Sequence, residues 1–239
     1  LRGAYHAEHL IIEAAPGQRP VLSQVFLSAA ARWTLRGLSL RCAASPEYSA
    51  HTLIHIESHG WHGPSFEMVV EGNSLSSDDD TSSWSAADWV ERGCSGITLQ
   101  ARDSVARDNV LRNVGMGIVL NAPNSVASNN SIDVFTRDGI RGAADDLLIE
   151  QNVIANCYDV DGNHDDGIQF YCGGAGCARA TLRQNMIMES TPPESPLRGH
   201  LQGIGCFDPP YEDWVVENNI VSVSHYHGIT VGGCSRCRI

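Results

Sequence analysis

The sequence predicts an all-β fold in which short parallel strands coil into a solenoid. Gly-Ile pairs recur at intervals of 21, 22, 28, 36 and 25 residues, and each of the first five is followed by an apolar run that contains an asparagine. A unit of about 21 to 22 residues leaves no room for a helix and holds two or three strands of about three to five residues each. The glycines of these pairs are Gly96, Gly117, Gly139, Gly167, Gly203 and Gly228.

The segments between the Gly-Ile pairs are each predicted to contain strands. Apolar and polar residues alternate in them, which is typical of half-buried strands. The asparagine marks a sharp turn, because asparagine tolerates the left-handed conformation and its side chain can bond its own backbone. Stacked turns are therefore expected to carry stacked asparagine side chains. These segments are 104–110, 125–132, 147–154, 181–187 and 214–220, with weaker copies at 69–75 and 34–40.

The composition predicts one globular domain over residues 1–239. The chain is 42% hydrophobic and 18% charged, and no stretch approaches the length of apolar sequence that spans a membrane. It carries a net charge of −12 and no lysine, so nucleic-acid phosphates are not an expected partner. Because the last unit stops within a repeat at Ile239, we expect the chain to be a fragment of a longer protein.

The repeat resembles the right-handed parallel β-helix superfamily of pectate lyases, polygalacturonases, alginate and chondroitin lyases, and phage tailspikes. The resemblance extends from about Leu10 to Ile239. It implies three strands per coil, with Gly-Ile opening the strand that lines a substrate groove. It also implies a polysaccharide partner, a secreted, cell-surface or virion location, and a trimer if the chain is tailspike-like.

Stacking the units converts the sequence into columns of residues on the solenoid surface. The isoleucine after each glycine is expected to fill the core. From the third unit onward the neighbouring columns become rich in charged and amide residues, and long excursions precede Gly167 and surround residues 191–196. Such loops are expected to wall a groove. The candidate residues are Asp138, Arg141, His164, Asp165, Asp166, Gln169, His200, Gln202, His225 and His227, with Asp208 nearby.

Hydrolysis of a glycosidic bond is the first functional hypothesis, because it needs one carboxylic acid and one carboxylate. Residues 136–140, Thr-Arg-Asp-Gly-Ile, resemble the Asn-Thr-Asp-Gly turn of polygalacturonases, and residues 165–168 resemble their paired aspartates. The resemblance implies that Asp166 is the general acid, that Asp138 and Asp165 hold water, and that His200 supports them. The family's Arg-Ile-Lys clamp is absent, since the chain has no lysine.

Elimination on a uronic acid polymer is the rival hypothesis, with Arg141 to neutralise the uronate and His164 or Tyr171 as base. A third is a non-catalytic β-helix that binds glycans or serves as a rigid rod. In each case we expect substrate or glycan contacts from Arg141, Gln169, Tyr171, Gln202, Asp208, His225 and His227.

No cofactor is required by these reactions, although calcium would assist binding of an anionic sugar. Residues 159–165 resemble part of a calcium loop that lacks its closing glutamate, which makes Asp159, Asp161 and Asp165 the candidate ligands. Two close cysteine pairs, Cys172 with Cys177 and Cys234 with Cys237, fit local disulfides or buried thiols better than a zinc site. The aromatic candidates for sugar stacking are Trp61, Trp84, Trp89, Tyr171, Phe207, Tyr211 and Tyr226.

Overall fold

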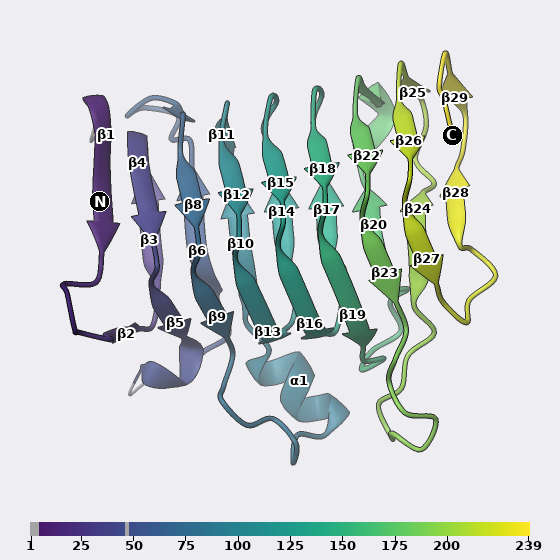
Figure 1. Cartoon of the computed structure of the whole chain (residues 1–239), viewed down its shortest axis with the longest axis horizontal. Helices are drawn as coiled ribbons and strands as arrows, with labels where there is room; N and C mark the ends of the chain where they lie inside the picture. The colour runs from purple at the N-terminus through teal and green to yellow at the C-terminus, as the bar shows by residue number, and fades with distance from the viewer. Residues whose placement is uncertain (1–4, 46–47) are drawn as a thin grey trace.

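A computed structural model describes residues 5–45 and 48–239 as a parallel β-helix, which confirms the predicted fold class. The coils stack side by side from the N-terminal to the C-terminal end of the molecule (Figure 1). Each regular coil contributes one strand to each of three parallel sheets, which we call sheets A, B and C. Every strand pairing between named strands is parallel, as in the pair β14 (Ile118–Leu120) and β17 (Ile140–Gly142).

The strands of the described residues are as follows. Sheet A contains β3 (Val25–Ser28), β6 (Thr52–Glu57), β10 (Ser95–Leu99), β14, β17, β20 (Asp166–Phe170), β24 (Gln202–Cys206) and β28 (Ile229–Val231). Sheet B contains β1 (Tyr5–Glu13), β4 (Ala31–Arg36), β7 (Ser65–Phe66), β8 (Val69–Glu71), β11 (Ala101–Arg102), β12 (Val105–Arg107), β15 (Val126–Ser128), β18 (Leu148–Glu150), β22 (Thr181–Arg183) and β26 (Val215–Glu217). Sheet C contains β2 (Val21–Leu22), β5 (Ser39–Arg41), β9 (Ser74–Ser76), β13 (Val110–Val114), β16 (Ser131–Phe135), β19 (Val153–Cys157), β23 (Met186–Met188) and β27 (Ile220–Ser222). A short fourth sheet contains β21 (Cys177–Ala178), β25 (Tyr211–Glu212) and β29 (Cys234–Ser235), and two 3-10 turns cover Cys42–Ala44 and Gly173–Ala175.

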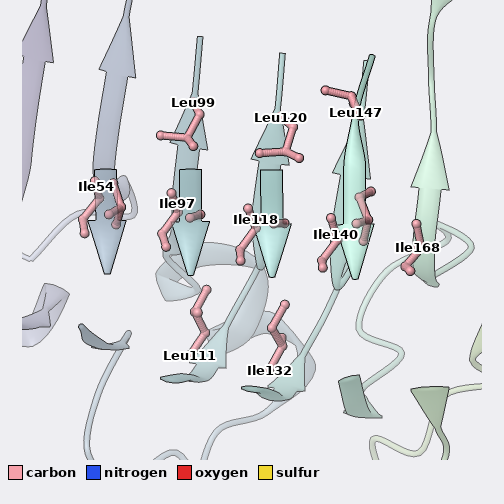
Figure 2. Packing of buried hydrophobic residues seen from close by; sticks show 14 of the residues in the cluster. Ile54, Ile97, Leu99, Leu111, Ile118, Leu120, Ile132, Ile140, Leu147 and Ile168 are labelled. Carbon is pink, nitrogen blue, oxygen red and sulfur yellow. The ribbon is translucent and has the colours of Figure 1, made fainter. Parts of the chain in front are cut away.

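The core is a set of stacked aliphatic columns between the sheets. Ile97, Ile118 and Ile140 are direct register partners on sheet A and are fully buried (Figure 2). Close packing requires a glycine in the first five of the Gly-Ile pairs: a Cβ on Gly117, for example, would lie 2.1 Å from the carbonyl oxygen of Gly139. At these five glycines the next coil leaves no space for a Cβ. A Cβ on Gly228, in the last coil, would meet no atom within 4 Å.

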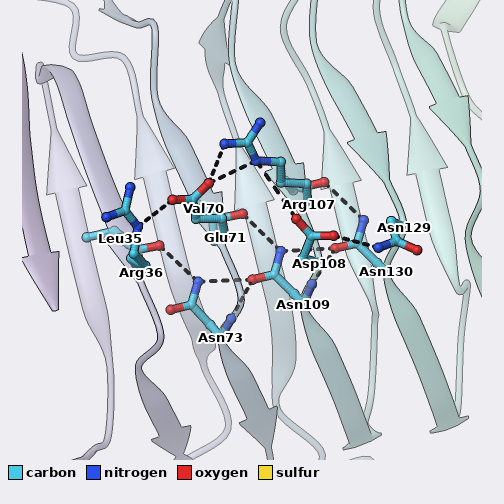
Figure 3. A network of polar contacts seen from close by, with 11 residues as sticks. Leu35, Arg36, Val70, Glu71, Asn73, Arg107, Asp108, Asn109, Asn129 and Asn130 are labelled. Carbon is cyan, nitrogen blue, oxygen red and sulfur yellow. Dashed lines mark hydrogen bonds and ion pairs between the residues drawn. The ribbon is translucent and has the colours of Figure 1, made fainter. Parts of the chain in front are cut away.

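A ladder of buried asparagine side chains joins the coils at the turn between sheets B and C. The carboxamide of Asn109 donates to Asn130 Oδ1 at 3.0 Å, and that of Asn130 donates to Asn152 Oδ1 at 2.9 Å. Each amide also donates to a backbone carbonyl, as Asn130 does to Ala106 at 3.0 Å. Figure 3 shows part of this ladder, from Asn73 to Asn130. Both ends of each buried carboxamide are thus satisfied within the stack.

The left-handed turn residue is not the ladder asparagine but the residue before it. Asp108, Asn129 and Gln151 have φ of 58°, 53° and 57° and precede Asn109, Asn130 and Asn152. The expectation that one asparagine both turns the chain and stacks was therefore wrong in detail. The turn uses two adjacent residues, one for the backbone conformation and one for the buried hydrogen bonds.

A row of ion pairs runs along the exposed side of sheet B beside the ladder (Figure 3). Glu71 accepts from Arg36 Nε at 2.6 Å and from Arg107 Nε at 2.9 Å. The hydrogen bond from Arg107 is the largest cause that lowers the pKa of Glu71. Because both arginines are about half-exposed, the pairs contribute little stability and mainly order the surface.

One helix interrupts the repeat, although the unit length predicted none. Helix α1 (Ala86–Arg92) begins with a capping box, in which Asp88 N–H donates to Ser85 Oγ at 3.2 Å and Ser85 N–H donates to Asp88 Oδ2 at 2.8 Å. Trp89 buries its ring against Trp84, with centroids 4.9 Å apart. None of the helices in the described ranges has the length and apolarity needed to cross a lipid bilayer.

Six cysteines form three disulfides. Two join the close pairs, Cys172–Cys177 and Cys234–Cys237, so the thiols that a zinc site would need are oxidised. The third, Cys42–Cys94, links residues 52 positions apart and was not predicted, because nothing in their spacing marks them as neighbours.

The asparagine ladder generates a stability prediction. Asn130→Ala leaves the buried N–H groups of Asn109 without an acceptor, and we expect it to lower the free energy of unfolding by about 3 kcal/mol. Chemical denaturation measures this loss. The control Asn121→Ala removes an exposed asparagine and is expected to change stability by less than about 0.5 kcal/mol. Equal effects of the two changes would contradict the role of the ladder.

Candidate active site

Part of the predicted polar columns meets at one surface, at the strands β17, β20 and β24 of sheet A. Arg141 lies opposite Gln169, and Asp166 lies opposite Gln202, as the aligned units predicted. Because the coils are in register, side chains from three turns of the chain converge at this surface. The excursion before β20 supplies Asn163 and His164 to its rim, and the loop after β24 supplies Phe207 and Asp208. The excursion around residues 191–196 contributes no lining residue, so the expectation that it walls the groove was wrong.

A cleft of about 380 Å³ lies on this surface. Tyr171 is 59% exposed at its edge, whereas Gln169 is almost buried at its base. A shallower hollow of about 530 Å³ lies beside the cleft and shares Arg141 and Asn163 with it. The cleft is lined by Arg141, Asn163, His164, Gln169, Tyr171, Phe207 and Asp208.

Asp138 and Arg141 form a tight ion pair at the floor of the cleft. Arg141 Nε and Nη2 lie 2.7 and 2.6 Å from Asp138 Oδ2, and the Asp138 side chain is fully buried. Burial is the largest cause that raises the pKa of Asp138, and Arg141 acts in the opposite direction. Arg141 Nη1 makes no hydrogen bond with the part of the chain that the structure describes, and the side chain is about one third exposed.

Asp166 is a buried carboxyl that orients an exposed histidine. Its Oδ2 lies 3.2 Å from His164 Nδ1 and 3.1 Å from Gln169 Nε2, while its Oδ1 is buried without a partner among the described residues. Burial is the main cause that raises the pKa of Asp166, and repulsion by Asp138 adds to it. The His164 side chain is 57% exposed, so the imidazole reaches the cleft and the carboxyl does not. This is the arrangement in which a carboxyl holds a general base.

Gly205 makes room for this carboxyl. A Cβ on Gly205 would lie 2.0 Å from Asp166 Oδ1 and 2.9 Å from the ring of Phe207. The position directly follows the isoleucine of the repeat, and the sequence alone does not indicate its role. Only the contact between coils shows that a side chain here would expel Asp166.

Asp165 does not join the site, which corrects the expectation that it holds a catalytic water. Its Oδ2 accepts a hydrogen bond from Cys157 Sγ at 3.1 Å, and only 6% of the residue is exposed. Burial raises the pKa of Asp165 to about 8, so the carboxyl is largely neutral at pH 7. Adjacent residues of an extended chain point in opposite directions, and this separates Asp165 from Asp166.

The remaining histidines lie beyond the cleft wall. His227 lies 5.0 Å from the ring of Phe207 and 5.2 Å from that of His225, measured between centroids. His225 has a lowered pKa, first through burial and then through the neighbouring imidazoles. His200 is exposed and pairs with Ser224 Oγ at 3.0 Å, so it does not support the aspartates as expected. Gln202 is buried, and its Oε1 has no partner among the described residues.

The three carboxylates of the expected calcium loop do not converge. Asp161 Oδ1 accepts the backbone N–H of Asn163 at 2.9 Å, and Asp165 is held by Cys157. Over residues 5–45 and 48–239, the one group of three histidine, cysteine or acidic side chains with ligand atoms within 4.8 Å is Cys42, His51 and Cys94. The two cysteines of that group are disulfide-bonded.

The aromatic candidates divide into three groups. Trp84, Trp89 and Tyr211 are buried and belong to the packing of the coils. Tyr171 and Phe207 line the cleft, whereas Trp61 and Tyr226 are exposed outside it. Among the lining residues, Asn163 was not singled out by the sequence, because asparagine in an acidic loop is more simply read as a turn residue.

No protein-family model matches the chain, and no curated protein or solved structure does. The kinship with polysaccharide-active proteins that the repeat implies therefore remains a prediction.

The raised pKa of Asp165 generates a prediction on stability. A carboxyl with a raised folded pKa binds its proton more tightly in the folded state, so its contribution is largest at low pH and is lost as pH rises toward about 8. We expect Asp165→Asn to reduce the fall in melting temperature between about pH 5 and 8, measured by thermal unfolding. Asp146→Asn is the control, because Arg179 lowers the pKa of that exposed carboxyl and its titration lies below this range. An unchanged slope for Asp165→Asn would contradict the assignment.

Proposed function

We propose that the protein cleaves a uronic acid-containing polysaccharide by β-elimination. The proposal rests on which residues line the cleft. Arg141, His164 and Tyr171, the three residues that elimination needs, all line it. The carboxyls that paired-acid hydrolysis needs do not line it. Asp138, Asp165 and Asp166 are at least 94% buried.

His164 is the base in this reaction. Nδ1 is held toward Asp166, which leaves Nε2 to take the C5 proton of the uronate. The C5–H bond breaks, a C4–C5 double bond forms, and the C4–O glycosidic bond breaks. The leaving oxygen takes a proton from the Tyr171 hydroxyl, and the Asp166 carboxylate stabilises the imidazolium that results.

Arg141 meets the uronate carboxylate in this proposal. Two of its nitrogens are fixed by Asp138, which sets the plane of the guanidinium and leaves Nη1 for the substrate. Neutralising the carboxylate makes the C5 proton easier to remove. Phe207 offers a ring face for an adjacent sugar, and Gln169 connects the cleft floor to Asp166.

Hydrolysis is the second candidate, favoured by the raised pKa values of Asp138 and Asp166, since a general acid must keep its proton near neutral pH. It requires these buried carboxyls to become accessible to substrate and water. Elimination requires no such movement, which is why it is the first candidate.

The test is incubation with neutral and uronate polysaccharides, with and without calcium, while recording new reducing ends and ultraviolet absorbance. We expect uronate polymers to yield both signals, because elimination leaves a conjugated unsaturated uronate at the new end. Reducing ends without absorbance would establish hydrolysis instead. If neither reducing ends nor absorbance appear and the protein still binds the glycan, a non-catalytic role would be established.

Substitutions of Asp166 and His164, the hydrogen-bonded pair that we call the dyad, provide a sharper prediction. We expect Asp166→Asn to lower kcat on the order of 10³-fold, because the imidazole loses its orienting carboxylate, and His164→Ala to lower it at least as much. Melting temperatures should change little for His164→Ala, whose side chain is mostly exposed. The control is His9→Ala, since His9 pairs with Thr34 on the distant strand β4. A fully active Asp166→Asn variant would contradict the dyad.

The pH dependence follows from the direction of the Asp166 shift. Because the pKa of Asp166 is raised, the carboxylate that stabilises the imidazolium is lost well above the usual pH range of an aspartate. We expect kcat/KM to fall as pH drops from about 8 to 5, and Asp166→Asn to remove part of this fall. A profile that rises toward acidic pH would instead indicate a protonated Asp166 acting as general acid.

A further inference from the structure

We infer that a second cleft on the same edge of sheet A binds another stretch of the same uronate chain. The inference rests on the proposed function and names the part of the substrate that the reacting cleft does not hold. This second cleft has a volume of about 410 Å³. Its lining includes Ser58, Pro64, Gln100, Arg102 and Asn121.

The two clefts lie along one column of the β-helix. Asn121 N–H donates to the strand β10 carbonyl of Leu99 at 2.9 Å, and Tyr171 N–H donates in the same way to Gly142 of β17 at 3.0 Å. Both residues therefore hold the first position after a sheet A strand. They are two coils apart, roughly 10 Å at the spacing of paired strands. The residue between them in the column is Ala143, which is small.

The polar groups of the second cleft match a uronate chain. Gln100 and Asn121 present carboxamides that donate to and accept from sugar hydroxyls. Arg102 is half-exposed and lies with its guanidinium 4.8 Å from the centre of the Phe66 ring, which holds its side chain at the cleft. A guanidinium is suited to a carboxylate. Its ion pair with Asp103 is also exposed and does not remove it from solvent.

Trp61 adds an exposed aromatic platform beside the second cleft. It is 94% exposed and sits in the loop of residues 58–64, whose ends, Ser58 and Pro64, line the cleft. The loop is closed by reciprocal backbone hydrogen bonds of 2.9 Å between His59 and Gly63. A short closed loop holds this large aromatic ring in water, so packing against the apolar face of a sugar would bury its apolar surface and favour binding.

Trp61 also supplies a direct test. The chain has five tryptophans, and the other four are at most 7% exposed, so Trp61 dominates quenching by acrylamide. We expect a uronate oligosaccharide to protect the fluorescence of the Asp166→Asn variant, which is expected to bind substrate but to turn it over far more slowly. The same titration with Trp61→Phe in that background should show no protection. Unchanged quenching at saturating oligosaccharide would overturn the inference, as would equal protection by a neutral oligosaccharide.

Chain-length dependence tests the same cleft through catalysis. We expect Arg102→Gln to lower kcat/KM about tenfold for long uronate chains, with little effect on the shortest cleaved oligomers. Arg112→Gln is the matched control, because Arg112 is also exposed and paired with an aspartate, but lies on sheet C. Equal rates for Arg102→Gln and wild type on long chains would overturn the inference while leaving elimination intact. If wild type cleaves no polysaccharide, the proposed function fails, and the Trp61 titration still decides whether the second cleft binds uronates.

Discussion

The structure depends on the register that the buried asparagine ladder imposes between coils. Each ladder carboxamide accepts from the coil before it and donates to the coil after it, as Asn130 does between Asn109 and Asn152. A slip of one residue would leave these groups buried and unpaired, at a cost of about 1–3 kcal/mol for each group. The aliphatic columns need the same register, because the space at Gly117 is filled by the backbone of the next coil. Hydrogen bonding and packing therefore select one alignment of the turns.

That alignment is also what assembles the cleft. Arg141, Gln169 and Gly205 stand at the same position of three successive coils, and the absence of a side chain in the third allows Asp166 to lie beneath the surface. Burial then changes the chemical role of this carboxyl. The buried carboxyl pairs with His164 Nδ1, and the imidazole is the group of the pair that is exposed to solvent. Two adjacent aspartates with one sequence signature thus have different environments, one beside histidine and one beside a cysteine thiol.

The proposed second cleft extends the same principle along the edge of sheet A. Residues that follow the strands form one column, so a polymer that enters at Tyr171 passes the positions of Asn121 and Gln100. A solenoid offers such a linear series of positions because every coil repeats the preceding one. An extended polysaccharide matches this geometry better than a compact ligand does.

The sequence by itself determined the coil architecture, the core column of isoleucines and the surface on which the polar residues gather. These features recur in every unit, so aligning the units on their Gly-Ile pairs predicts which residues of neighbouring coils lie side by side. The tertiary structure alone decided which of the gathered residues face the cleft. His164, Asp165 and Asp166 are consecutive, yet Asp166 pairs with His164 whereas Asp165 pairs with Cys157. This division depends on strand direction and on the loop before β20, where the repeat is interrupted. The helix α1 and the disulfide Cys42–Cys94 were likewise beyond the sequence, because both belong to excursions where the periodic signal is lost and contacts form between distant segments.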